Sequence, residues 1–310
     1  MKAILINIRI KVINIKNNYK SFFFCLTWFF VFSSAHSADM GADINEDKTN
    51  IPAQVEINKT DLKESKTQWT MGIGLGVFDY NLYPGAKQTN RLIFPAPYFT
   101  YRSPKFEVDR GIKSFIYNSE TIIIDISADF GFPVDSDDTV ARKGMPDLDF
   151  VLQLGPSLEF LLNDKNKNYF DARFEIPVRI AIAVDLGSVD NIGYLVEPRF
   201  TLKHQRLANT GLSHKATFGL KFATQEFHAY YYDVEPEFAT ATRAEYKSDA
   251  GFGGSFVNYR ISYKTNDFVY WAFVSYQSLR GAEFEDSPLV LQNDYYFLGV
   301  GFAWIFAQSL

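Results

Sequence analysis

Histidines and carboxylates are the residues of this sequence whose types could support acid–base catalysis. Beyond the N-terminal segment the histidines are His204, His214 and His228. Glu226 lies two residues before His228, a spacing that would put both side chains on one face of a β-strand, near its outer end. No serine or aspartate is placed to complete a catalytic set, and a solvated residue at the rim of a sheet is the simpler interpretation. We therefore expect a protein that is not an enzyme, with no catalytic residue, no metal site and no cofactor.

Charged residues at alternate positions suggest a second kind of chemistry, the binding or conduction of polar solutes. Both signs occur on neighbouring predicted strands, which argues against strong ion selectivity. Charges enclosed in this way must be paired or hydrated, so a lumen closed by cross-strand ion pairs is favoured and a narrow polar channel is the alternative. The residues expected to point inward are Asp125, Asp129, Asp149, Glu159, Asp171, Arg173, Glu175, Arg179, Glu197, Arg199, Lys203, Lys215, Lys221 and Arg260.

The elements that would position these charges are strands with two different faces. From Trp69 onward, apolar residues recur with period two, which is typical of β-strands. The clearest case is 170–185, where Phe170, Phe174 and Val178 share the apolar face and Arg173 and Arg179 lie on the other. An amphipathic helix cannot produce this division, so the sequence predicts an all-β fold.

Strand length and aromatic residues favour a membrane barrel over a soluble sandwich or lipocalin-like barrel. Many segments reach the roughly ten residues that a tilted strand needs to cross a bilayer. Aromatic residues close the apolar faces, as in the girdles of outer-membrane barrels, at Trp69, Tyr101, Phe170, Tyr230 and Phe306. About twelve strands are predicted, with starts near Trp69, Arg91, Lys105, Ile112, Thr121, Leu148, Phe170, Tyr194, His214, Val257, Phe268 and Tyr295. The expected fold is a transmembrane antiparallel up-and-down β-barrel.

Links between the predicted strands alternate in length. Short polar links at 102–104, 163–166 and 264–267 are typical of periplasmic turns. Longer links at about 134–147, 232–255 and 281–293 would be extracellular loops. An even strand number puts the long and short links at opposite ends and returns both termini to the periplasm.

The N-terminal segment has the pattern of a secretory signal peptide. A basic region precedes the apolar run 21–32, which is too short for the ~20 residues of a transmembrane helix. Ala35 and Ser37 supply the small residues that signal peptidase requires, so we expect cleavage between Ser37 and Ala38. This segment contains the only cysteine, Cys25, and the exported chain would then have no thiol. The predicted domains are a signal peptide at 1–37, a flexible acidic periplasmic arm at 38–67 and the barrel at 68–310.

Net charge excludes one class of partner. Residues 1–37 carry five basic residues and no acidic one, so their removal would change the formal net charge from −5 to −10. Because nucleic-acid binding depends on basic surface, we expect no nucleic-acid partner.

Several motifs resemble those of the MipA/OmpV family of outer-membrane proteins. They cover about 69–306, and comprise Trp69–Gly76, Tyr83-Pro84-Gly85, Phe94–Arg102, Gly144–Asp149, Tyr230–Val234 and Glu285–Val290. The resemblance implies an outer-membrane barrel, embedded in lipid, that acts as a scaffold between a lytic transglycosylase and a penicillin-binding protein. It also implies two alternatives that some family members suggest, a porin-like channel and a surface adhesin.

Overall fold

The computed structural model describes residues 68–103, 106–109, 112–163, 170–185, 187–204 and 210–309. The chain divides into a unit of residues 1–61, all outside these ranges, and a second unit of residues 62–310. The predicted signal peptide, its cleavage site at Ser37 and Ala38, and the predicted arm 38–67 therefore lie outside the described residues. None of the helices in the described part of the chain is long and apolar enough to cross a membrane.

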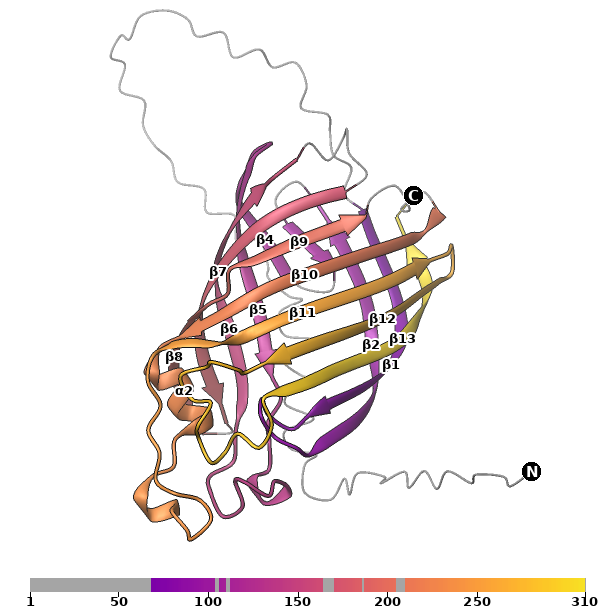
Figure 1. The fold of residues 1–310 in the computed structure, drawn as a ribbon. Helices are drawn as coiled ribbons and strands as arrows, with labels where there is room; N and C mark the ends of the chain where they lie inside the picture. The colour runs from indigo at the N-terminus through magenta and orange to yellow at the C-terminus, as the bar shows by residue number, and fades with distance from the viewer. Residues whose placement is uncertain are drawn as a thin grey trace, which may run out of the picture. The chain divides into compact units, whose positions relative to one another are not determined.

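One antiparallel sheet makes up the described fold (Figure 1). Its strands are β1 (Gln68–Asn81), β2 (Thr89–Arg102), β3 (Phe106–Asp109), β4 (Ile112–Asn118), β5 (Ile122–Gly131), β6 (Phe150–Leu161), β7 (Phe170–Val184), β8 (Val189–Val196), β9 (Arg199–His204), β10 (Leu212–Ala223), β11 (Gly251–Lys264), β12 (Phe268–Ser278) and β13 (Asp294–Gln308). The helices are α2 (Gln225–Tyr232) and two short 3-10 turns, η1 (Ser136–Asp138) and η3 (Pro236–Phe238).

The sheet closes on itself because β13 pairs with β1 and β10 pairs with β11. β8 and β9 occupy one place between β7 and β10, since both pair with β7 and both pair with β10. The thirteen strands of the described residues therefore fill twelve positions. Glu197 and Pro198 separate β8 from β9 at this position of the sheet. The strand is broken there because proline has no N–H group to donate a ladder hydrogen bond. The predicted barrel of about twelve strands is confirmed.

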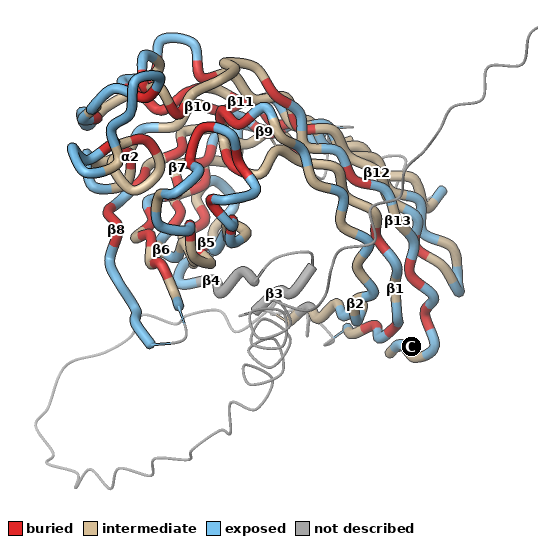
Figure 2. Tube along the Cα trace, turned by 90° about the horizontal axis from the view of Figure 1, so that it is seen from below, coloured by how far each residue is buried: buried red, intermediate tan, exposed pale blue. Residues whose placement is uncertain are grey.

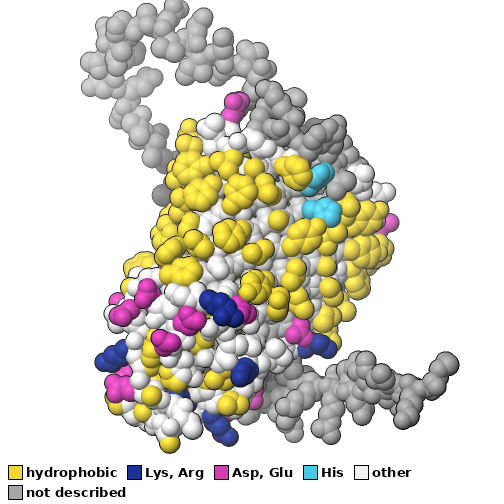
Figure 3. All heavy atoms as spheres, in the orientation of Figure 1, with side chains coloured by type: hydrophobic (Ala, Val, Ile, Leu, Met, Phe, Trp, Pro, Cys, Tyr) yellow, Lys and Arg dark blue, Asp and Glu magenta, His cyan; other side chains and the backbone are white. Residues whose placement is uncertain are grey.

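The two faces of the strands have the predicted division. On β13, the large side chains of Tyr296, Val300, Trp304 and Phe306 are exposed on the outside of the barrel. Their neighbours Tyr295, Ala303 and Ile305 are buried, on the lumen side. Figure 3 shows apolar side chains covering the strands, while charged side chains gather over the lower end. This exterior matches a membrane-spanning wall.

Long links lie at one end of the barrel, here called the loop end. They connect β1 to β2, β5 to β6, β10 to β11 and β12 to β13. Gln68 of β1, Gln308 of β13 and the β2–β3, β4–β5 and β11–β12 links lie at the other end, here called the turn end. The three predicted long links therefore lie at the loop end and the three predicted short links at the turn end, while 82–88 and the short β7–β8 link also lie at the loop end.

One expected strand segment is a helix instead. Residues 225–232, which include the predicted girdle residue Tyr230, form α2 at the loop end (Figure 2). Helical spacing brings Phe227, Tyr230 and Tyr231 to one side, where they pack on Ala181 and other buried residues of the lumen-facing wall. This long-range packing stabilises the helix, and α2 therefore lies against the inner face of the wall.

Candidate functional site: the charged lumen and its loop cap

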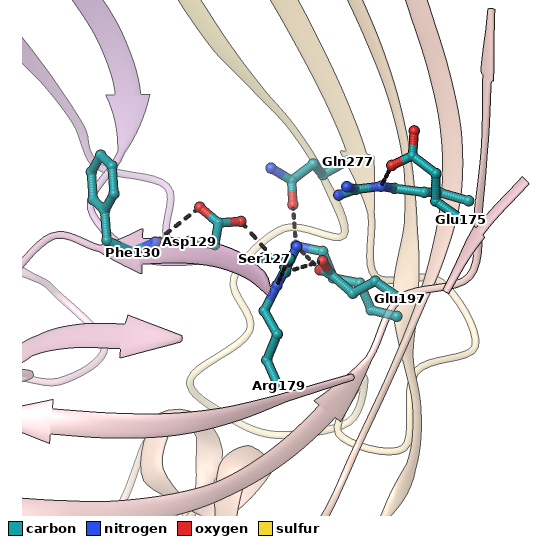
Figure 4. Close-up of polar contacts among 9 residues, drawn as sticks. Ser127, Asp129, Phe130, Glu175, Arg179, Glu197 and Gln277 are labelled. Carbon is teal, nitrogen blue, oxygen red and sulfur yellow. Dashed lines mark hydrogen bonds and ion pairs between the residues drawn. The ribbon is translucent and has the colours of Figure 1, made fainter. Parts of the chain in front are cut away.

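β7 positions a buried cation on the lumen side of the barrel wall. Arg179 is 3% exposed and donates from Nη1 to Glu197 at 2.6 Å and from Nε to Ser127 at 2.7 Å (Figure 4). Lys221 Nζ lies 3.9 Å from the other oxygen of Glu197, and Arg179 lies 3.8 Å from Asp129. On the inner face of the wall, carboxylates of β5 and of the β8–β9 link thus bind cations of β7 and β10.

A second group of ion pairs extends toward the turn end. Arg199 of β9 donates to Glu175 of β7 at 2.7 Å. Arg173 donates to Glu159 at 2.8 Å and to Asp171, on its own strand, at 2.6 Å. The buried carboxylates of this group thus have a cationic partner, which offsets the cost of enclosing their charge. We call these residues together with Ser127, Asp129, Arg179, Glu197 and Lys221 the ion-pair network.

The remaining predicted lumen residues lie elsewhere. Asp125 is fully buried on the lumen side of β5. Arg260 of β11 is placed 5.7 Å from the ring centre of Phe273, a cation–π geometry. Lys203 and Lys215 face each other on β9 and β10, near the turn end. Asp149 lies just before β6 and outside the ion-pair network.

Aromatic rings line the opposite side of the lumen. Phe78 of β1 stacks on Trp271 of β12 with ring centres 5.5 Å apart, and Phe273 meets Phe297 edge-on at 4.9 Å. Trp271 packs directly over Gly301, which faces the lumen. A larger residue would not fit at this position, because its Cβ would lie 2.4 Å from the Trp271 ring. We call Phe78, Tyr80, Trp271, Phe273 and Phe297 the aromatic wall. In the sequence, aromatic residues at both odd and even positions of β12 and β13 indicate this wall, whereas a polar inner face was expected.

The long links pack together at the loop end into what we call the loop cap, residues 82–88, 132–149, 224–250 and 279–293. Tyr83 donates to the carbonyl oxygen of Leu289 at 2.6 Å, and Tyr232 donates to that of Pro84 at 3.1 Å. Tyr232 also stacks on Phe284, with ring centres 3.7 Å apart. These contacts join three links that are distant in the sequence.

Two buried arginines hold the cap through backbone carbonyls. Arg142 donates to the carbonyl oxygen of Tyr231 at 2.9 Å, and Arg243 donates to those of Ala141 at 2.8 Å and Phe238 at 2.7 Å. Burial lowers the pKa of Arg142, and burial raises the pKa of Tyr83 to about 12 despite the nearby arginine. Each arginine thus crosslinks segments that no local sequence pattern connects.

The candidate acid–base pair of the sequence is not formed. His228 lies in α2, buried against Phe284, and its Nδ1 is 2.8 Å from the carbonyl oxygen of Asp249. Because the segment is a helix, Glu226 is not on the same face two residues away. Tyr230 of α2 instead donates to Asp149 at 3.2 Å. Among the described residues, no group of three or more His, Cys, Asp or Glu is arranged to hold a metal ion.

A closed antiparallel barrel with an apolar exterior and enclosed charges defines an integral outer-membrane β-barrel protein. The family model described as "MltA-interacting protein MipA" matches residues 71–306. The chain belongs to this family, as its motifs predicted, and is located in the outer membrane. No curated protein matches the chain.

Three solved structures have a low overall similarity to the chain. The translocator domain of the autotransporter NalP from Neisseria meningitidis has a TM-score of 0.36 and 10% identity, with 79% of this chain and 90% of that chain covered. The toluene transporter TodX from Pseudomonas putida has a TM-score of 0.32 and 10% identity, covering 78% and 89%. OprG from Pseudomonas aeruginosa has a TM-score of 0.25 and 11% identity, covering 77% and 95%.

Proposed function

We propose that this protein is a non-catalytic scaffold of the outer membrane that holds a peptidoglycan-remodelling enzyme, a lytic transglycosylase, near the cell wall. The observation that carries the proposal is the match to the family model over 71–306, since that family is described as MltA-interacting. A penicillin-binding protein is the second partner that the family resemblance implies. The expected absence of catalytic residues is consistent with a binding role.

The arrangement of the barrel supports a role for its turn end. Bacterial outer-membrane barrels place short turns in the periplasm and long loops outside. The turn end would then face the cell wall, together with Gln68 and the predicted arm that precedes it. The ion pairs neutralise most charges of the lumen wall, which favours a function exerted through the surface.

Co-purification tests the scaffold role. The chain, extracted in mild detergent, should retain a lytic transglycosylase, and a variant lacking residues 38–67 should retain several-fold less. Arg280→Ala is a matched control, because this exposed arginine lies in the 279–293 link at the loop end and should leave recruitment unchanged. Absence of any peptidoglycan enzyme from the wild-type complex would contradict the proposal. Equal recruitment by the shortened chain would indicate that the enzyme binds the turns of the turn end and not the arm.

A small-solute channel is the second candidate, and the exposure of two charges favours it. Asp129 is 55% exposed and Lys221 is 35% exposed, although both belong to the lumen side. Water therefore reaches part of the ion-pair network. If the lumen conducts, neutralising Arg173, Arg179 and Arg199 should change the conductance in a planar bilayer, and an unchanged value would count against this candidate.

A further inference from the structure

The ion-pair network contains a row of four charges whose signs alternate (Figure 4). Asp129 lies 3.8 Å from Arg179, and Arg179 donates to Glu197 at 2.6 Å. Glu197 in turn lies 3.9 Å from Lys221. The side chains of the two inner members, Arg179 and Glu197, are only 3% and 7% exposed. The row is therefore enclosed at its centre and ends in a carboxylate on β5 and an ammonium group on β10.

Both end charges are accessible to water although they face the lumen. On the inward face of β5, Asp125 and Ser127 are buried, whereas the next inward side chain, Asp129, is 55% exposed. On β10, Thr217 is buried and Lys221 is 35% exposed. The inward side chains of these strands are thus enclosed toward the turn end, and a water-accessible space begins at the level of the two end charges.

The end charges keep unused hydrogen-bonding capacity toward the described residues. The Lys221 ammonium group has three N–H bonds, and one of them is donated to Gln277 Oε1 at 3.0 Å. Asp129 Oδ1 accepts from the backbone N–H of the adjacent Phe130 at 2.9 Å, while Oδ2 has the longer contact with Arg179. Each end charge can therefore bind a further group of opposite sign.

The spacing of the end charges determines the length of a molecule that could join them. Their strands are separated by β6, β7 and the shared place of β8 and β9. Adjacent strands lie about 4.8 Å apart, so the two backbones are roughly 15–20 Å apart along the wall. The contacts along the row put the charges themselves on the order of 10 Å apart. A molecule that joins them must carry an ammonium group and a carboxylate several bonds apart, as a short peptide does.

Hydroxyl and amide groups lie near each end charge. The hydroxyl of Tyr231, in α2, would be 3.5 Å from a Cβ added at Gly131, two residues after Asp129 on β5. At the other end, Tyr295 of β13 donates to the same oxygen of Gln277 that accepts from the ammonium group, at 2.8 Å. Such groups can donate to a peptide carbonyl or accept from a peptide N–H.

We propose that this space binds a zwitterionic peptide of two or three residues, with its ammonium group on Asp129 and its carboxylate on Lys221. The two end charges fix the direction of the peptide, because a reversed peptide would bring like charges together. The Arg179–Glu197 pair between them has no net charge, which suits the neutral middle of the ligand. This inference goes beyond the scaffold role, does not depend on it, and holds whether or not the lumen conducts.

Equilibrium dialysis with radiolabelled alanyl-alanine tests the site. The full chain is refolded in detergent in the presence of the dipeptide, so that the loop cap cannot exclude it. N-acetyl-alanyl-alanine lacks the ammonium charge and alanyl-alanine amide lacks the carboxylate. Each should bind the wild-type chain roughly tenfold more weakly than the dipeptide, because a hydrogen bond between charged groups is lost.

Two variants assign the ends of the ligand. Asp129→Asn should bind the dipeptide and its N-acetyl form about equally, and Lys221→Met should bind the dipeptide and its amide about equally. Asp79→Asn is the matched control, since Asp79 pairs with Arg91 on the outside of the barrel and should leave both preferences unchanged.

Equal binding of the dipeptide and its blocked forms by the wild-type chain, or no binding of any of them, would overturn the site. An Asp129→Asn variant that keeps the full preference for the free ammonium group would also overturn it. Heat-modifiable gel mobility verifies the folding of each variant. If Lys221→Met fails to fold, Lys221→Gln, which can still donate to Gln277, gives the same test.

Discussion

Arg179 is the residue whose loss should disturb the lumen most. Its side chain is enclosed between β5 and the β8–β9 link, where it binds Glu197 and Ser127. Arg179→Met would leave Glu197 buried with only the more distant Lys221 as a cationic neighbour. Removing one partner of a buried ion pair costs about 3–5 kcal/mol, and we expect a loss of stability near the lower limit.

Urea unfolding of the refolded barrel measures this effect. Arg91→Met is the matched control, since Arg91 is 63% exposed in its pair with Asp79. Surface pairs of this kind contribute roughly 0–1 kcal/mol. The double variant Arg179→Met/Glu197→Gln should regain part of the loss. Equal effects of Arg179→Met and Arg91→Met would contradict a structural role of the ion-pair network.

His228 should make the loop cap sensitive to acid. Burial lowers the pKa of His228 below its usual 6.5, although the Asp249 carbonyl and the charge of Glu283 oppose this shift. The opened cap binds the proton at His228 more readily than the closed cap does. The free energy by which neutral His228 stabilises the closed cap is therefore fully present above the usual pKa of histidine. This contribution falls as pH drops through about 6.5 and is fully lost below the lowered pKa.

Hydrogen exchange of 224–250, corrected for intrinsic rates, should therefore accelerate as the pH falls through about 6.5 toward the lowered pKa of His228. His228→Gln should remove most of this dependence, whereas His214→Gln, on a strand at the turn end, should preserve it. An unchanged acid response in His228→Gln would assign the sensitivity to another group.

At the scale of elements, the inward glycines of β1 and β13 determine how closely the aromatic wall lies to the sheet. Gly301→Ala would place a Cβ 2.4 Å from Trp271 and 2.6 Å from the carbonyl oxygen of Leu75. Overpacking of this kind costs about 1–3 kcal/mol. Gly187→Ala is the control, since nothing lies within 4 Å of its added Cβ. Comparable urea midpoints for the two variants would show that the rings adapt without cost.

The sequence predicted the strands well because their two faces differ in chemistry. A period of two is a local property, so the outward aromatics of β13 and the inward carboxylates of β7 could be assigned without knowing the neighbouring strands. Pairing is not local. Arg173 binds Glu159 of β6, a partner that only the register between strands determines, in addition to Asp171, two residues away on its own strand.

α2 shows the limit of the same approach. Residues 225–232 carry aromatics at both parities, so a continued strand and a helix were equally compatible with the local pattern. Packing of Phe227 and Tyr231 on the inner face of the wall stabilises the helix relative to a continued strand. The loop cap is similarly hidden, because Arg142 and Arg243 bind backbone carbonyls, which every residue offers.

At the scale of the whole molecule, the described lumen has two unlike halves and a cluster of packed links at one end. The ion-pair network lies on strands β5 to β10, the aromatic wall lies on β1, β12 and β13, and the loop cap is packed at the loop end. A scaffold requires none of these to move, whereas a channel would require the cap to open. The cap is therefore the feature that separates the two candidate functions.

Single-channel recording in a planar bilayer should distinguish them. With the cap closed, we expect the wild-type barrel to insert and to remain electrically silent. The variant Arg142→Ala/Arg243→Ala removes two of the side chains that join 132–149 to 224–250, and should loosen the cap and produce fluctuating conductance. Far-UV circular dichroism must show unchanged strand content, so that any current reflects the cap and not the wall. Steady conductance of the wild-type protein would instead favour the channel, because ions could then cross the lumen only if the cap had opened.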